Sequence, residues 1–90
     1  MSNALSPADA ALKGKRDYWL DDVVREQNRT INYAEMVILS AEVEDIGGIR
    51  RATEREIMHL KLSMAALKEI EALDAKEKAA RALVPERVPA

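Results

Sequence analysis

The chain has 90 residues, a net charge of −2 from 14 basic and 16 acidic residues, and no cysteine. The lack of cysteine excludes disulfides, thiolate metal sites and thiol catalysis, and the near balance of charge argues against a general attraction to nucleic acid or anionic lipid. One domain of this size buries only about two-thirds of the surface that its unfolded chain exposes. We therefore expect a cytoplasmic protein that gains stability by association, with no membrane partner and no cofactor.

Residues 1–16 are expected to form an N-terminal arm that contains a short helix. Ser6 can cap this helix, Pro7 suits its first position, and Asp9 faces its positive end. Gly14 is expected to end it, because glycine is unfavourable inside a helix and common just beyond one.

Residues 17–46 predict one long helix, because they contain neither glycine nor proline. Apolar residues recur along it at alternating spacings of four and three, which is the heptad pattern of a coiled coil. This heptad seam consists of Leu20, Val24, Gln27, Ile31, Ala34, Ile38 and Ala41. One flanking row consists of Trp19, Val23, Thr30, Tyr33 and Val37, and another of Met36, Leu39, Val43 and Ile46. Because one partner helix cannot cover three rows, this helix should contact at least two neighbours.

Gly47 and Gly48 predict the turn of a helical hairpin that spans residues 17–83, since glycine supplies the positive φ angles that a reversal needs. With this turn, residues at the same height should have numbers that sum to 95. The stripe predicted for the second helix begins with Ile57, Leu60, Met64 and Leu67. Residues 84–90, which contain two prolines, are expected to form a C-terminal tail.

Charge differs between the two halves of the chain. Residues 1–46 carry five basic and nine acidic side chains, whereas residues 47–90 carry nine basic and seven acidic ones. An acidic helix and a mildly basic helix can lie side by side, although each exposed ion pair contributes only about 0.2–1 kcal/mol.

The stretch TEREIMH, residues 53–59, contains the candidate metal ligands. Glu56 and His59 share a helical face, and their Glu-x-x-His spacing resembles half of the paired-metal motif of ferritin-like bundles. The resemblance implies an iron or manganese site, with Glu35 or Glu42 as a further ligand and a second copy completing it. The same letters predict a capping box, in which Thr53 and Glu56 each bond the other's backbone amide. We favour the capping box, which leaves His59 exposed or half-buried, because the chain has only one histidine.

No catalytic motif accompanies this stretch. The four serines share a single histidine, and no nucleophile elbow or phosphate-binding glycine loop is present. Arg50, Arg51 and Arg55 form a compact basic group, but acids interrupt it and no aromatic residues are interleaved for stacking, so we expect no nucleic-acid partner. Trp19, one of three aromatics, could anchor a protein partner or be covered by the short N-terminal helix or a neighbouring chain.

Together these patterns predict an all-α protein: an antiparallel hairpin of two long helices, with a short N-terminal helix, assembled into an oligomeric helical bundle. The predicted function is that of a small non-catalytic structural, adaptor or assembly subunit that self-associates and binds protein partners in a larger complex. The alternative is a ferritin-like metal-binding hairpin completed by dimerisation, with Glu35, Glu56 and His59 as ligands. The residues expected at the interface are Trp19, Leu20, Val24, Ile31, Ile38, Leu60, Met64 and Leu67.

Overall fold

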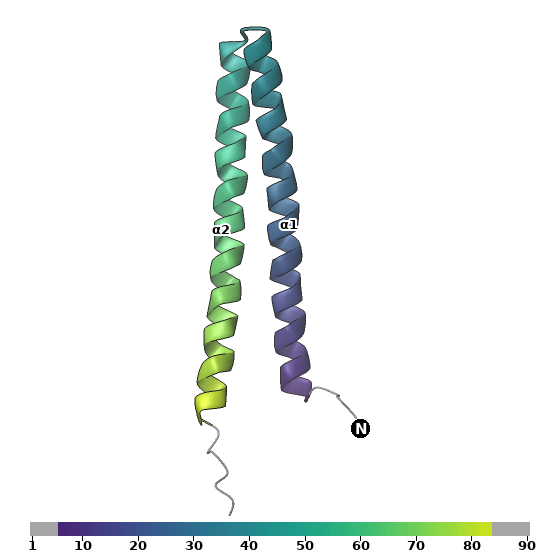
Figure 1. Cartoon of the computed structure of the whole chain (residues 1–90), viewed down its shortest axis with the longest axis vertical. Helices are drawn as coiled ribbons and strands as arrows, with labels where there is room; N and C mark the ends of the chain where they lie inside the picture. Colours follow the sequence, from purple (N-terminus) through teal and green to yellow (C-terminus); the bar gives the residue numbers. More distant parts are fainter. Residues whose placement is uncertain (1–5, 84–90) are drawn as a thin grey trace, which may run out of the picture.

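The computed structural model describes residues 6–83, which form two long helices packed side by side as an antiparallel hairpin (Figure 1). Helix α1 spans Pro7–Glu42 and helix α2 spans Ile46–Leu83. The extents of the molecule, 75 × 25 × 16 Å, are those of a thin rod. The predicted all-α hairpin is therefore confirmed, while the predicted tail, residues 84–90, lies outside the described residues. Neither of the two helices has a stretch that is apolar enough to cross a membrane.

Helix α1 begins where the sequence predicted, but it does not end at Gly14. Ser6 caps its first turn and Pro7 is its first residue. The prediction of a separate short N-terminal helix is wrong, because those residues form the first turns of α1 itself. A single glycine costs only about 1 kcal/mol inside a helix, and the uninterrupted helix brings Arg16 within 2.9 Å of Asp74 on α2.

The turn comprises residues 43–45, so the turn predicted at Gly47 and Gly48 is misplaced. Glu44 has a positive φ angle of 56°. The amides of Glu44 and Asp45 donate to carbonyl oxygens in the last turn of α1 at 3.1 and 2.8 Å, which is the pattern of a Schellman motif. Asp45 then caps α2 by accepting a hydrogen bond from the Gly48 amide at 2.9 Å.

The two glycines differ in their surroundings within the first turn of α2. A β-carbon at Gly48 would collide with the side chains of Asp45 and Ser40, so glycine allows the start of α2 to approach both its cap and the end of α1. A β-carbon at Gly47 would meet the end of the flexible Arg51 side chain at 3.2 Å. The reversal was misplaced because a glutamate, rather than a glycine, adopts the positive φ angle.

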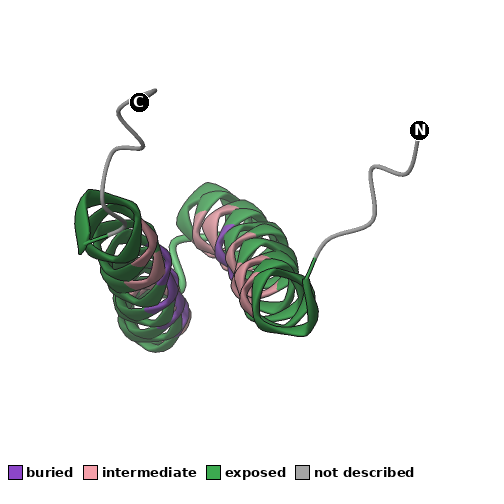
Figure 2. Ribbon diagram, turned by 90° about the horizontal axis from the view of Figure 1, so that it is seen from below, coloured by how far each residue is buried: buried purple, intermediate pink, exposed green. Residues whose placement is uncertain are grey.

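The buried residues lie along the inner faces by which the two helices meet (Figure 2), and most of these buried residues are small or polar. The buried hydrophobic residues among those described are Ala52, Ala66 and Ile70, and no large side chain in this part of the chain is fully buried. The polar residues that reach the same degree of burial are Glu26, Thr30, His59 and Ser63. The inner face of α1 includes the first predicted flanking row, Trp19, Val23, Thr30, Tyr33 and Val37, all of which are buried or half-buried.

Candidate functional site

A buried cluster of charged and polar side chains joins the middle of the two helices. Glu26 lies on the inner face of α1, and its Oε2 atom is 2.5 Å from Nδ1 of His59 on α2. Its Oε1 atom accepts a hydrogen bond from Arg29 at 2.7 Å. The Thr30 hydroxyl donates a hydrogen bond to the backbone carbonyl oxygen of Glu26 at 2.8 Å. Every buried side-chain nitrogen or oxygen within residues 6–83 has a partner. The cluster is therefore a satisfied polar layer between the helices.

The surroundings of Glu26 favour its ionised form. The side chains of Glu26 and His59 are only 5% and 10% exposed, and the ring of Tyr33 stacks on the imidazole with centroids 5.4 Å apart. The hydrogen bond from His59 lowers the pKa of Glu26, and Arg29 lowers it further, although burial alone would raise it. The carboxylate thus holds a negative charge inside the hairpin at neutral pH.

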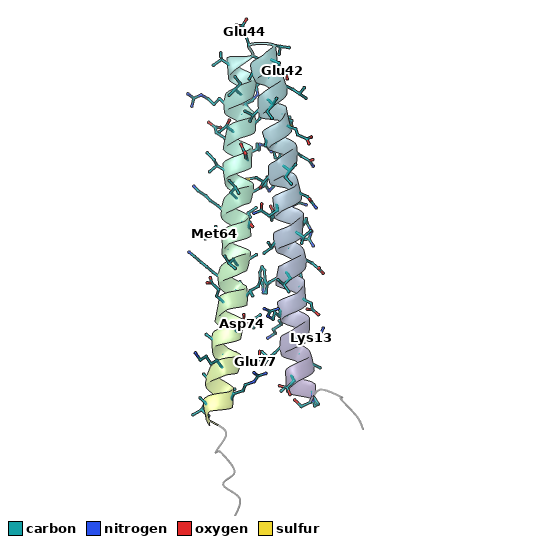
Figure 3. The ribbon with its side chains drawn as sticks, in the orientation of Figure 1. Lys13, Glu42, Glu44, Met64, Asp74 and Glu77 are labelled. Carbon is teal, nitrogen blue, oxygen red and sulfur yellow. The ribbon has the colours of Figure 1, made fainter. Side chains whose placement is uncertain are left out.

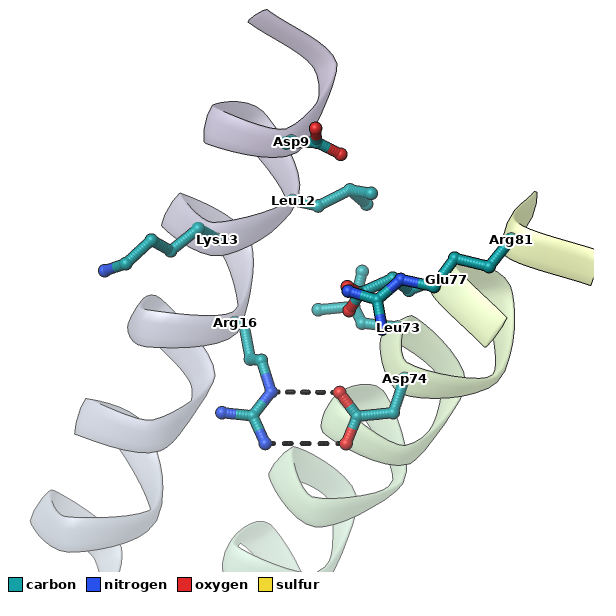
Figure 4. Close-up of a pocket in the computed structure, with 8 residues that line it drawn as sticks. All are labelled: Asp9, Leu12, Lys13, Arg16, Leu73, Asp74, Glu77 and Arg81. Carbon is teal, nitrogen blue, oxygen red and sulfur yellow. Dashed lines mark hydrogen bonds and ion pairs between the residues drawn. The ribbon is translucent and has the colours of Figure 1, made fainter. Parts of the chain in front are cut away.

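Two further polar contacts define how the helices are aligned. Gln27 donates from Nε2 to the Ser63 hydroxyl at 2.9 Å. Arg16 donates to both carboxylate oxygens of Asp74 at 2.9 and 3.5 Å (Figure 4), which lowers the pKa of Asp74 and raises that of Arg16. In both pairs the residue numbers sum to 90, whereas the predicted turn required 95. The sum is lower than predicted because the turn is centred on Glu44, which gives 88, and the Glu26–His59 pair sums to 85.

The predicted metal ligands lie in different environments. Glu35 is exposed on α1, and Glu56 is half-buried on α2. His59 faces Glu26, an acid that the metal hypothesis did not include. Within residues 6–83, no group of three or more histidine, cysteine, aspartate or glutamate side chains is placed to hold a metal ion. The described residues of one chain therefore do not form the metal site that the ferritin-like alternative requires.

The capping box predicted at Thr53 and Glu56 is wrong. Helix α2 begins at Ile46, so both residues lie inside the helix, where backbone amides donate to carbonyl oxygens one turn earlier. The predicted exposure of His59 is also wrong, because this residue is buried on the inner face. In this structure the TEREIMH stretch supplies a histidine that packs and pairs between the helices.

Glu26 was not among the predicted site residues, although the sequence contains a signal for it. The flanking row on α1 was identified through Val23 and Thr30, and its heptad spacing requires one member between them, at residue 26. A carboxylate in a buried row needs a partner, since an unpaired buried charge is very unfavourable. The single histidine of the chain would then have been the first partner to consider.

The heptad seam lies outside the contact between the two helices. The large apolar residues of the seam on α1 and of the predicted stripe on α2 are 39–60% exposed. We call them the apolar face, which consists of Leu20, Val24, Ile31, Ile38, Ile57, Leu60, Met64 and Leu67. Helical geometry turns each row about 100° from its own inner face, in the same rotational sense. Because the helices are antiparallel, both rows come to the same side of the hairpin and adjoin there.

Trp19 is the one predicted interface residue that belongs to the inner face. It is half-buried, and its ring contacts exposed Tyr18 edge to face, with centroids 5.0 Å apart. The other predicted interface residues all belong to the apolar face and are exposed.

Comparisons with known proteins supply no functional assignment. No protein-family model matches this chain, and no curated protein or solved structure matches it. The functional proposal therefore depends on the geometry and chemistry of the hairpin itself.

Proposed function

We propose that this protein is a non-catalytic assembly subunit that self-associates through its apolar face and serves as a structural or adaptor part of a larger complex. The observation that carries the proposal is the contrast between the exposed apolar face and an interior whose buried hydrophobic residues are two alanines and one isoleucine. Contiguous apolar surface of this kind marks sites of protein interaction. We also propose a cytoplasmic location, which the composition supports.

The energetics favour association. Burying one large aliphatic side chain fully contributes about 1.5–3 kcal/mol. The apolar face has eight such residues, each roughly half exposed, so covering them contributes about 1 kcal/mol per residue, or about 8 kcal/mol per chain. Two chains together gain about 16 kcal/mol, against an association cost of about 4–15 kcal/mol. A dimer in which the two apolar faces cover each other is therefore expected to be stable.

Two adjacent residues test the proposal under matched conditions. Ile38, 58% exposed, belongs to the apolar face, whereas Leu39, 62% exposed, points away from α2 and lies outside that face. Ile38→Asp is expected to dissociate the assembly and unfold most of the chain, because it places a charge in the covered surface. Leu39→Asp makes the same chemical change and is expected to leave the assembly intact.

Native mass spectrometry of protein purified without chelator reads out both variants. An unchanged oligomer in Ile38→Asp, or equal dissociation in both variants, would refute the role of the apolar face. The same spectra report bound metal. Iron or manganese retained by the wild type and lost in His59→Ala would overturn the non-catalytic assignment in favour of the metal-binding alternative.

A further inference from the structure

Charged residues of opposite sign border the apolar face along its two long edges. On α1 the outer edge carries an acidic rim, spaced by seven residues and interrupted by one asparagine: Asp21, Asn28, Glu35 and Glu42. On α2 the outer edge carries a basic rim of three cations and one acid: Arg50, Glu54, Lys61 and Lys68. Helical geometry places the acidic rim and the α2 residues Glu54, Lys61 and Lys68 on the side away from the inner faces. Arg50 lies in line with Ile57 of the apolar face, seven residues before it.

Most rim charges have no partner inside the hairpin. No ion pair among the described residues includes an acid of the acidic rim or a lysine of the basic rim. Arg50 makes one long contact, 3.9 Å from Glu54, which is itself exposed. These charges therefore remain free to pair with another molecule that covers the apolar face.

Two copies can bring their apolar faces together by either of two symmetric arrangements. If the two-fold axis runs along the hairpins, both turns lie at the same end, and α1 of each copy faces α2 of the other. If the axis runs across the hairpins, the turns lie at opposite ends, and each helix faces its own equivalent. The first arrangement brings acidic rims beside basic rims. The second brings like charges together, which is unfavourable.

The alignment of the hairpin places two pairs of opposite rim charges at similar heights in the same-end arrangement, while Glu35 comes level with residue 55, next to Glu54. Residue numbers at one height sum to about 90 in the Arg16–Asp74 and Gln27–Ser63 pairs and to 85 in the Glu26–His59 pair, and we use the value of 90 that two of the three pairs share. Asp21 is then level with residue 69 of the facing α2, next to Lys68. Glu42 is level with residue 48, two positions from Arg50. Two-fold symmetry makes each of these pairs occur twice.

We therefore propose that a second copy of this chain covers the apolar face, with its turn at the same end. The product is a four-helix bundle in which each helix is antiparallel to both of its neighbours. This inference rests on the proposed self-association and adds the identity and orientation of the partner. Exposed ion pairs are individually weak, so the apolar face supplies the affinity and the rims select the orientation.

Spin labels at the two ends of the hairpin measure this orientation. Because the chain has no cysteine, Glu44→Cys at the turn and Lys76→Cys near the open end each give one attachment point for a nitroxide. Neighbouring helices pack about 8–10 Å apart, so same-end copies hold either pair of labels within about 30 Å. Both positions lie about 15 residues from the centre of the apolar face, so opposite-end copies separate the labels by about 45 Å.

Pulsed dipolar spectroscopy distinguishes the outcomes. Short distances at both positions are expected. Distances near 45 Å in an intact dimer would overturn the orientation and leave the proposed function standing. A monomeric mass without dipolar coupling would overturn both.

Charge reversal tests whether the rims select the orientation. Lys61→Glu combined with Lys68→Glu is expected to weaken the dimer by about tenfold or more at low salt, because the two Asp21–Lys68 contacts become repulsive and each basic rim becomes acidic. Adding Asp21→Lys and Glu35→Lys is expected to restore the affinity, because residues 21 and 68, which lie at similar heights, then again carry opposite charges. An unchanged dissociation constant in the first variant, or no recovery in the second, would overturn the role of the rims.

Discussion

The inner faces and the apolar face of the hairpin use opposite kinds of side chain. The most buried positions between the helices hold two alanines, one isoleucine, serine, threonine and the Glu26–His59 pair, whereas leucine, isoleucine, valine and methionine occupy the exposed apolar face. Small residues allow a close approach but bury little apolar area. Under the proposed self-association, contacts within the chain set the alignment, and contacts between chains supply most of the hydrophobic stabilisation.

The comparison also explains why a polar layer can sit inside so thin a molecule. The turn and the open end of the hairpin lie at opposite ends of the rod (Figure 3). Glu42 and Glu44 lie at the turn, and Lys13 and Glu77 lie toward the open end. Over such a length, two helices whose buried hydrophobic residues are two alanines and one isoleucine could shift along each other with little loss of buried apolar area. The buried, hydrogen-bonded Glu26–His59 pair has few alternative partners, so it favours a single register.

Removing Glu26 is expected to have the largest effect on the inner faces. Glu26→Ala should lower the free energy of unfolding by about 3 kcal/mol, because it leaves the buried His59 without its partner. Glu69→Ala is the control, since Glu69 is exposed and makes no ion pair among the described residues, and should change stability by less than about 0.5 kcal/mol. Urea titrations at one fixed protein concentration compare the two, because association contributes to stability. Equal losses would show that the polar layer contributes no more than the surface does.

A smaller effect is expected from acid. The pKa of Glu26 is lowered in the folded state, so its stabilisation is complete above the unfolded glutamate pKa of about 4.3 and is lost as the pH falls through the folded value. Glu26→Gln cannot titrate at this position, so the stability difference between wild type and this variant should shrink as the pH falls below about 4. Urea titrations across this range test it, and a difference independent of pH would contradict the folded-state charge on Glu26.

The fold was predictable because it depends on patterns that extend over many residues. Runs free of glycine and proline, with apolar residues at helical spacing, predicted two long helices and a reversal between them. Ser6 and Pro7 also predicted the first turn of α1, because a cap depends on a few neighbouring residues. Such local and repetitive patterns can be interpreted from the sequence without knowledge of the tertiary contacts.

The predictions that were wrong are those that depend on which residues of the two helices face each other. Periodicity identified three rows on α1, but it could not decide that the flanking row through Val23 and Thr30 would turn inward while the seam stayed exposed. The turn was misplaced because Glu44 adopts a conformation that usually favours glycine. Without the correct turn, His59 could not be aligned with Glu26, so the buried pair was missed.

The smallest expected change in stability comes from the two glycines at the start of α2, one of which lies toward α1 and the other toward solvent. Gly47→Ala should stabilise the protein by about 0.5–1 kcal/mol, because alanine is the better helix former and only the flexible Arg51 end lies nearby. Gly48→Ala should lose that gain, because its β-carbon displaces Asp45 from the cap of α2, a loss of about 1 kcal/mol. Thermal unfolding of both variants at one concentration should therefore rank Gly47→Ala above Gly48→Ala. The reverse order would mean that the close approach at Gly48 does not hold the start of α2 in place.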